Sequence, residues 1–144
     1  MQTTDFSRSL ANYFIFLQYH ISKMSSTKFL TFFRFAVGGG AWFLPLPTLK
    51  LFGLTSPPDD QEILGWRLFA SREIAVGLGL VGFFSPQAAV IKAILSMGVL
   101  FDSMDAVATL VAYSRGSITS YAAALAGGGA VLAAAVGTLA LKEH

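Results

Sequence analysis

The sequence predicts an all-α integral membrane protein: a four-helix up-down bundle with an N-terminal amphipathic helix at the membrane interface. Apolar residues make up 54% of its 144 residues and charged residues only 12%, and the mean hydropathy is +0.63. A soluble domain usually carries about twice that charged fraction. The apolar residues also gather in four long runs, each close to the roughly 20 residues that a helix needs to cross a bilayer.

Composition excludes several kinds of site. A formal net charge of +2 is too small to indicate a nucleic-acid partner. Because the chain has no cysteine, disulfides and thiolate chemistry are excluded. The two histidines, His20 and His144, cannot form a histidine metal site. The sequence therefore predicts no metal and no cofactor.

Residues 1–27 are predicted to form an amphipathic N-terminal segment ahead of a transmembrane domain over residues 28–144. The first apolar run, 13–17, is too short for a signal peptide and follows the acidic Asp5. Within 6–21, apolar residues recur at helical spacing while polar residues occupy the rest of the wheel. This pattern predicts a helix on the membrane surface, and a helix packed on the bundle is the alternative.

Four spanning helices are predicted over residues 28–44, 62–84, 87–113 and 118–141. The first stops at Pro45 and Pro47, which cannot continue a regular helix. Short turns separate the last three, so that neighbouring helices run antiparallel. The second and fourth are rich in glycine and alanine, which let membrane helices approach closely and permit either a monomer or a homodimer.

Two carboxylates, Asp102 and Asp105, interrupt the third span one helical turn apart. A charged side chain at the bilayer centre costs about 3 kcal/mol on insertion scales, so these residues require partners or a function. Other ionisable residues lie inside the first two spans: Arg34, Arg67, Arg72 and Glu73. At about 1.5 Å of rise per residue, all but Arg67 lie about 12 to 17 Å from the same membrane surface, and Arg67 lies at about 8 Å. The sequence therefore predicts one buried site shared by three helices.

Aromatic residues are predicted to line this site together with Arg34 and Arg67. Trp66 shares a helix face with Glu73, and Phe69 and Phe101 lie close to the charged layer along the same two helices. Tyr121, at the start of the fourth span, is a candidate hydrogen-bond donor. Such walls suit an apolar polyene, polyketide or terpenoid substrate that enters from lipid.

Acid–base catalysis is the chemistry that these residues fit best. Two neighbouring carboxylates resist joint ionisation, which provides one proton donor and one proton acceptor. Asp102, Asp105 and Glu73 are the predicted acids and bases, and Arg72 orients them or stabilises an oxyanion. In epoxide opening, an acid protonates the epoxide oxygen while a carboxylate activates water or a substrate hydroxyl. Soluble limonene-type epoxide hydrolases use an Asp–Arg–Asp site on an unrelated fold, and a proton-shifting isomerase would use the same groups.

A resemblance to a known family rests on residues 65–77, GWRLFASREIAVG, on the later DSMD motif at 102–105, and on the glycine- and alanine-rich last span. Over roughly residues 29–141 the chain resembles small four-span membrane proteins of fungi and some bacteria that are distantly similar to DoxX-like proteins. Some fungal members lie in polyketide or terpenoid pathways, in which epoxide hydrolase or cyclase roles have been proposed for them. The resemblance implies that the family's motif positions are Arg67, Arg72, Glu73, Asp102 and Asp105.

Two hypotheses about function follow. The first is an integral membrane epoxide hydrolase or epoxide-opening cyclase for secondary metabolite biosynthesis. The second is a non-catalytic DoxX-like accessory subunit or a small-solute or proton conduit. The charged residues could also form an ion-pair network that only fixes helix register.

The distribution of positive charge predicts the orientation. One side of the bundle collects Arg8, Lys23, Lys28, Lys92 and Lys142, and the other has Lys50 and Arg115 beside Asp59, Asp60 and Glu62. The positive-inside rule therefore places both termini in the cytoplasm. In a eukaryote, the expected membrane is the endoplasmic reticulum.

Overall fold

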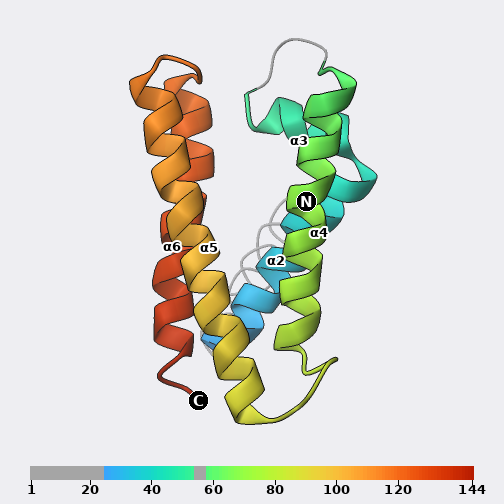
Figure 1. Cartoon of the computed structure of the whole chain (residues 1–144), viewed down its shortest axis with the longest axis vertical. Helices are drawn as coiled ribbons and strands as arrows, with labels where there is room; N and C mark the ends of the chain where they lie inside the picture. The colour runs from blue at the N-terminus through green and yellow to red at the C-terminus, as the bar shows by residue number, and fades with distance from the viewer. Residues whose placement is uncertain (1–24, 54–57) are drawn as a thin grey trace, which may run out of the picture.

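The computed structural model describes residues 25–53 and 58–144, and over these residues the fold is all-α (Figure 1). Its five helices are α2 (Ser26–Phe43), α3 (Pro45–Leu51), α4 (Asp60–Leu80), α5 (Ala88–Ser114) and α6 (Ser120–Ala140). The all-α prediction is confirmed for this part of the chain, and each long helix ends within four residues of its predicted bounds. The amphipathic helix predicted over 6–21 lies outside the described residues.

Side-chain caps explain where most of the long helices begin. Ser25 and Thr119 each accept a hydrogen bond from a backbone N–H in the first turn, of α2 and α6 respectively. Asp59 and Glu62 form a reciprocal capping box at the start of α4. Each cap satisfies an N–H group that has no partner within its own helix, and so fixes the helix start locally.

The prolines after the first span start a new helix. As predicted, α2 ends before Pro45, but α3 begins at that residue and is bent 118° from α2. Proline fits the first position of a helix because the N–H that it lacks would have no partner there. The sequence predicts only the end of a span at this point, so α3 was not expected.

The long helices form two pairs that lie in a V (Figure 1). Helix α2 packs along α4, and α5 packs along α6, with α2–α6 and α4–α5 contacts joining the two pairs. The pairs meet near the α4–α5 connection and diverge toward the opposite end (Figure 1). At that opposite end Gly53 approaches α6: a Cβ atom on Gly53 would lie 3.2 Å from the Tyr121 ring. The two pairs therefore meet along one half of the molecule and have a further close approach at Gly53 in the other half.

Helix α2 is also tied to the end of α6 outside the apolar segments. The Glu143 carboxylate accepts hydrogen bonds from the Ser26 N–H at 2.8 Å and from the Thr27 hydroxyl at 3.3 Å. These hydrogen bonds lower the pKa of Glu143 below its ordinary value. The first turn of α2 and the last residues of the chain are therefore held together at this end.

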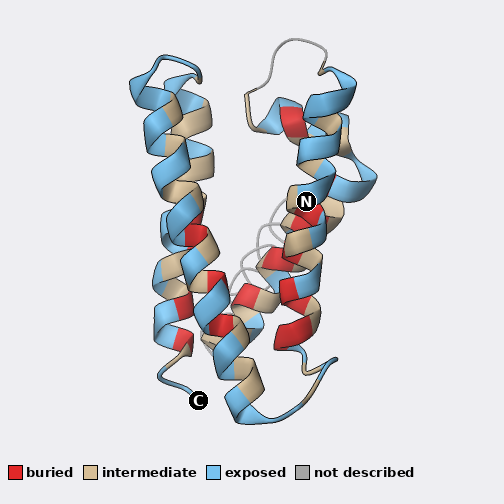
Figure 2. Cartoon of the chain, in the orientation of Figure 1, coloured by how far each residue is buried: buried red, intermediate tan, exposed pale blue. Residues whose placement is uncertain are grey.

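Large apolar side chains cover much of the outer surface. Few residues are buried, so the core is small (Figure 2). The buried core cluster consists of Leu30, Val76, Leu80, Leu95, Ala133 and Ala140. Outward-facing residues such as Phe32, Phe43 and Leu110 are 68%, 76% and 66% exposed. Such a surface is compatible with contact with a lipid bilayer.

Two helices, α5 and α6, are long and apolar enough to cross a membrane. The bent pair α2 and α3 makes a third candidate, either as a broken span or as a re-entrant loop. Helix α4 is less apolar because Arg67, Arg72 and Glu73 lie in its central part. Length and composition therefore indicate two or three spans among the described residues.

Candidate functional site

Arg34 is buried between two carboxylates that come from two other helices. From α2, its Nη1 donates to Glu73 Oε2 on α4 at 2.6 Å, and its Nη2 donates to Asp102 Oδ2 on α5 at 2.6 Å. The three side chains are only 3%, 4% and 7% exposed. A Cβ atom on Gly98 would lie 3.0 Å from Arg34 Nη2, so glycine at this position of α5 leaves room for the guanidinium.

Arg72 makes a second bridge, nearer the surface. Its Nη2 lies 2.5 Å from Asp105 Oδ2, and its Nη1 lies 3.2 Å from Asp105 Oδ1. Its Nε and Nη2 also donate to Glu73 Oε1, at 3.3 and 3.2 Å. The guanidinium lies 5.0 Å from the centre of the Phe69 ring and 5.3 Å from that of Phe101, within cation–π range. In contrast to Arg34, the Arg72 and Asp105 side chains are 27% and 36% exposed.

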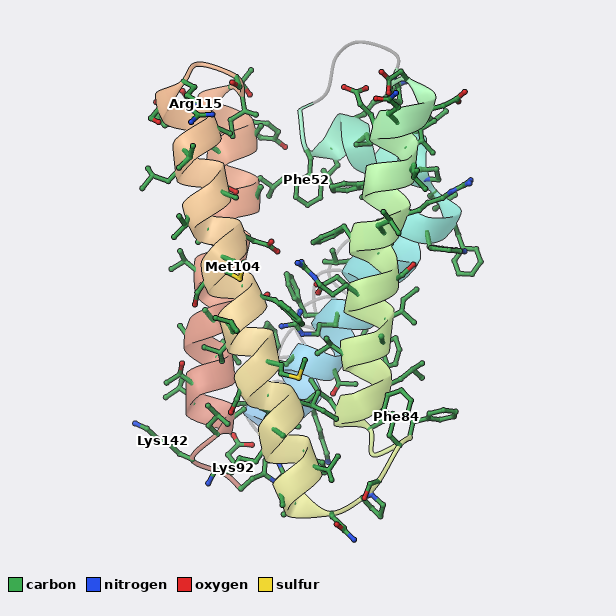
Figure 3. The ribbon with its side chains drawn as sticks, in the orientation of Figure 1. Phe52, Phe84, Lys92, Met104, Arg115 and Lys142 are labelled. Carbon is green, nitrogen blue, oxygen red and sulfur yellow. The ribbon has the colours of Figure 1, made fainter. Side chains whose placement is uncertain are left out.

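These contacts join five residues into one ion-pair network: Asp102, Arg34, Glu73, Arg72 and Asp105, in order of contact. Both ends of the network lie on α5, one helical turn apart. Figure 3 shows nitrogen and oxygen atoms of side chains between α4 and α5 near the labelled Met104. The network links α2, α4 and α5, and so joins the two helix pairs.

The network contains three carboxylates but only two arginines. With every group ionised it would carry one uncompensated negative charge in mostly apolar surroundings. Burying an unpaired charge is costly, and one bound proton would remove the imbalance. The electrically neutral form of the network therefore holds one carboxylic acid and two carboxylates.

Two residues predicted for the site lie away from the network. Arg67 is exposed on α4 and forms no ion pair within the described part of the chain. Tyr121 is 57% exposed at the start of α6 and lies beside Gly53. The structure therefore does not bring Arg67 or Tyr121 to the charged groups.

The predicted aromatic residues Phe69 and Phe101 do flank the network, and Trp66 stacks on Phe69 with ring centres 5.2 Å apart. Phe52 also contacts Trp66 edge-on, with ring centres 5.2 Å apart. Phe52 follows α3, which was not predicted, so periodicity gave no signal for this contact. The indole Nε1 of Trp66 is buried and has no hydrogen-bond partner among the described residues.

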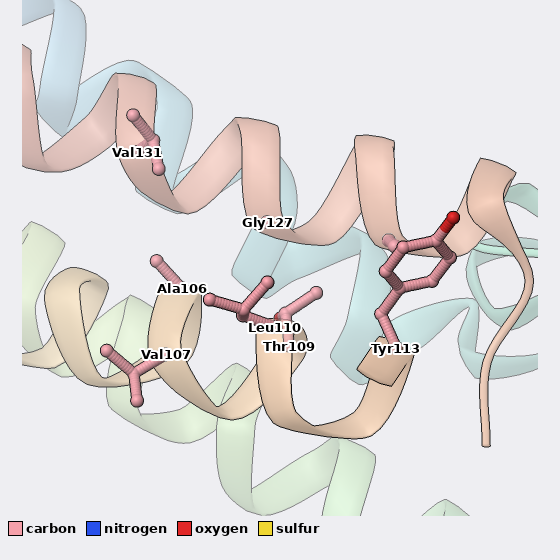
Figure 4. Close-up of a pocket in the computed structure, with 8 residues that line it drawn as sticks. Ala106, Val107, Thr109, Leu110, Tyr113, Gly127 and Val131 are labelled. Carbon is pink, nitrogen blue, oxygen red and sulfur yellow. The ribbon is translucent and has the colours of Figure 1, made fainter. Parts of the chain in front are cut away.

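Two apolar hollows open on the helix surfaces. The hollow between α4 and α5 has a volume of about 240 Å³ and is lined by Arg72, Ala75, Val76, Phe84, Ile94, Met97 and Phe101. The hollow between α5 and α6 has a volume of about 350 Å³ and is lined by Ala106, Val107, Thr109, Leu110, Tyr113, Ala123, Gly127 and Val131 (Figure 4). Of these two hollows, the one between α4 and α5 reaches the ion-pair network, through Arg72.

Comparisons with protein-family models, curated proteins and solved structures find no match to this chain.

Proposed function

We propose that this chain is an integral membrane epoxide hydrolase or epoxide-opening cyclase that acts without a cofactor on an apolar, polyketide- or terpenoid-like substrate. The observation that carries the proposal is the partly exposed Arg72–Asp105 pair, which Arg72 joins to the buried Glu73. Each arginine of the network lies between two carboxylates, as in an acid–Arg–acid site. This is also the activity implied by the resemblance to small four-span membrane proteins of fungi and bacteria.

Asp102 is the proposed general acid. Both oxygens of Glu73 already accept hydrogen bonds from arginine. Asp105 likewise accepts through both of its oxygens. Asp102 accepts only through Oδ2, and no donor to its Oδ1 is found within the described residues. The one proton of the neutral network is therefore assigned to Oδ1 of Asp102.

Asp105 is the proposed general base because it is the most accessible carboxylate of the network. It removes a proton from water, or from a hydroxyl of the substrate, while that oxygen bonds to an epoxide carbon. The C–O bond of the epoxide breaks, and its oxygen takes the proton of Asp102. Arg72 holds Asp105 in place and stabilises the developing negative charge. Transfer of a proton from Asp105 to Asp102 restores the starting state.

The proposed arrangement in the membrane is a four-span up-down bundle that includes α4. Glu73 pairs with Arg34 on α2, and Arg72 pairs with Asp105 on α5. These ion pairs compensate two of the charges that make α4 less apolar, which supports a spanning α4. Lys92 and Lys142 lie at one end of the molecule and Arg115 at the other (Figure 3). The lysine-rich end is placed in the cytoplasm, with the endoplasmic reticulum as the membrane in a eukaryote and the segment 6–21 on its surface.

Asn substitutions at the two aspartates test the proposal. The Asp102→Asn and Asp105→Asn variants should remain folded in detergent, since each makes the network neutral without a proton, but both should lose turnover of a lipophilic epoxide. Asp60→Asn, an exposed acid outside the network, is the matched control. Incorporation of oxygen from labelled water separates hydrolysis from cyclisation. If both network variants keep full activity, acid–base catalysis by these residues is excluded.

One observation favours a second function, as a non-catalytic DoxX-like membrane component. Arg34, Glu73 and Asp102 are almost completely buried and mutually paired, as expected for a network that only sets helix register. On this hypothesis the wild-type protein has no turnover, and both Asn variants lose thermal stability.

A further inference from the structure

The hollow between α4 and α5 combines an apolar wall with one charged group. Six of its seven lining residues are apolar, and the seventh is Arg72. Phe84 and Met97 are 64% and 54% exposed, so this hollow opens to the outside of the helix bundle. In a bilayer the opening faces acyl chains. The hollow therefore offers a sideways path from lipid to the ion-pair network.

Arg72 still has one donor to offer at this position. A guanidinium has five N–H groups. Four of them are used: Nε–H and one Nη2–H for Glu73, and one Nη2–H and one Nη1–H for Asp105. The remaining Nη1–H can donate to an oxygen of a bound molecule. The flanking rings of Phe69 and Phe101 keep the guanidinium in place.

The size of the hollow limits what it can hold. Its volume of about 240 Å³ falls below the roughly 300–1,000 Å³ that encloses a drug-sized ligand. It can therefore accept one end of a long molecule but not the whole of it. The rest of such a molecule would remain among the lipid chains.

We propose that the α4–α5 hollow binds the oxygen-bearing end of an elongated apolar molecule, which enters sideways from the bilayer and places its oxygen at Arg72. The inference rests on the proposed function, and it defines the substrate class as long-chain molecules whose epoxide lies close to one end. The larger α5–α6 hollow has no charged group in its lining and does not reach the network, so it lacks this anchor.

Photolabelling tests the binding site without requiring catalysis. The probe is a long-chain primary alcohol with a diazirine close to its hydroxyl group, and a hydrocarbon of equal length with a diazirine at the same distance from one end is the comparison. Peptide mass spectrometry should place the alcohol label on residues 75–84 and 94–101, and the hydrocarbon should label them less. Ala75→Phe, which fills the hollow, should reduce the alcohol label about tenfold. Ala123→Phe, in the α5–α6 hollow, should leave it unchanged.

Turnover of a terminal long-chain epoxide separates this inference from the proposed function. Ala75→Phe should raise KM about tenfold, while Ala123→Phe should leave KM and kcat unchanged. Labelling at the α4–α5 hollow without any turnover would contradict the proposed catalysis and leave the binding site standing. Turnover that is insensitive to Ala75→Phe, with the label elsewhere, would overturn the binding site and leave the catalysis standing. Equal labelling by the alcohol and the hydrocarbon would exclude Arg72 as the anchor.

Discussion

Arg34 is the residue on which the buried half of the network depends. Its two Nη groups are the hydrogen-bond donors to Glu73 Oε2 and to Asp102 Oδ2. Without Arg34, Asp102 has no ion-pair partner among the described residues, and three carboxylates share the single charge of Arg72. Removing one partner from a buried ion pair typically costs about 3–5 kcal/mol, because the other charge stays buried without compensation.

We therefore expect Arg34→Met to lower the free energy of unfolding by about 3–5 kcal/mol. Adding Asp102→Asn to that variant removes the carboxylate that has lost its partner, and should recover a large part of the loss. Thermal unfolding of the two variants in detergent measures both effects. If the double variant is less stable than Arg34→Met alone, Asp102 is held by groups other than Arg34.

Helix geometry explains which site residues could be predicted from the sequence. A fixed rise per residue gave Arg34, Glu73 and Asp102 similar depths in the membrane, and the structure places the three in contact. The depth of a residue in the membrane does not determine the direction in which its side chain points from the helix. Arg67 precedes Arg72 by five residues, which rotates it by about 140° around α4 and turns it outward. Side-chain reach also matters: Arg72 leans across to its sequence neighbour Glu73, although the two point about 100° apart.

At the scale of the helices, a close contact between α2 and α4 holds Glu73 against Arg34. A Cβ atom on Gly38 would lie 3.0 Å from the backbone oxygen of Ala70, from Glu73 Cβ and from Ile74 Cγ1. The Ala70 oxygen is a backbone atom of α4 and Glu73 Cβ is bonded directly to that backbone, so neither can rotate away. At the adjacent Gly39, no atom of another described helix lies within 4 Å of the equivalent position.

Gly38→Ala should therefore push α2 away from α4 and destabilise the protein by about 1–3 kcal/mol. Gly39→Ala is the matched control on the same helix, and should be neutral or stabilising by up to about 1 kcal/mol because alanine favours helix. Thermal unfolding in detergent compares the pair. Equal stability of the two variants would mean that α2 and α4 are not in close contact at Gly38.

The break between α2 and α3 was only partly predictable. Pro45 excludes a continuous helix, so the end of α2 followed from sequence. The same residue is equally suited to begin a helix, and nothing local distinguishes a loop from a seven-residue helix such as α3. The contact of Phe52 with Trp66 depends on the direction in which α3 turns the chain. Hydrophobic periodicity therefore could not predict this contact.

At the scale of the whole molecule, the sequence predicts the long helices better than it predicts how they pair. The pattern of four long helices was predictable from apolar runs and turns, since each run is long enough to form a helix. The division into two diverging pairs was not, because it results from which small-residue faces meet. Gly38 packs against α4, while Gly137 approaches Val99 on α5.

Single cysteines test the four-span arrangement without interference, because the chain has no native cysteine. If α4 spans the membrane, Gln61→Cys and Ser117→Cys should react with an impermeant thiol reagent from the lumenal or external side. Gln87→Cys should then react only from the cytoplasmic side. Labelling of positions 61 and 87 from the same side would show that α4 does not cross.

The ion-pair network also has a consequence for how the sequence can change during evolution. Asp102, Arg34 and Glu73 each lie on a different helix, and each depends on the charge of its neighbour. A mutation that removes Arg34 leaves Asp102 without an ion-pair partner among the described residues, whereas one that removes Asp102 alone leaves Arg34 paired with Glu73. Among homologues, loss of the arginine should therefore follow loss of an acid rather than precede it. The order in which these positions vary among homologues would therefore show which helix lost its ion pair first.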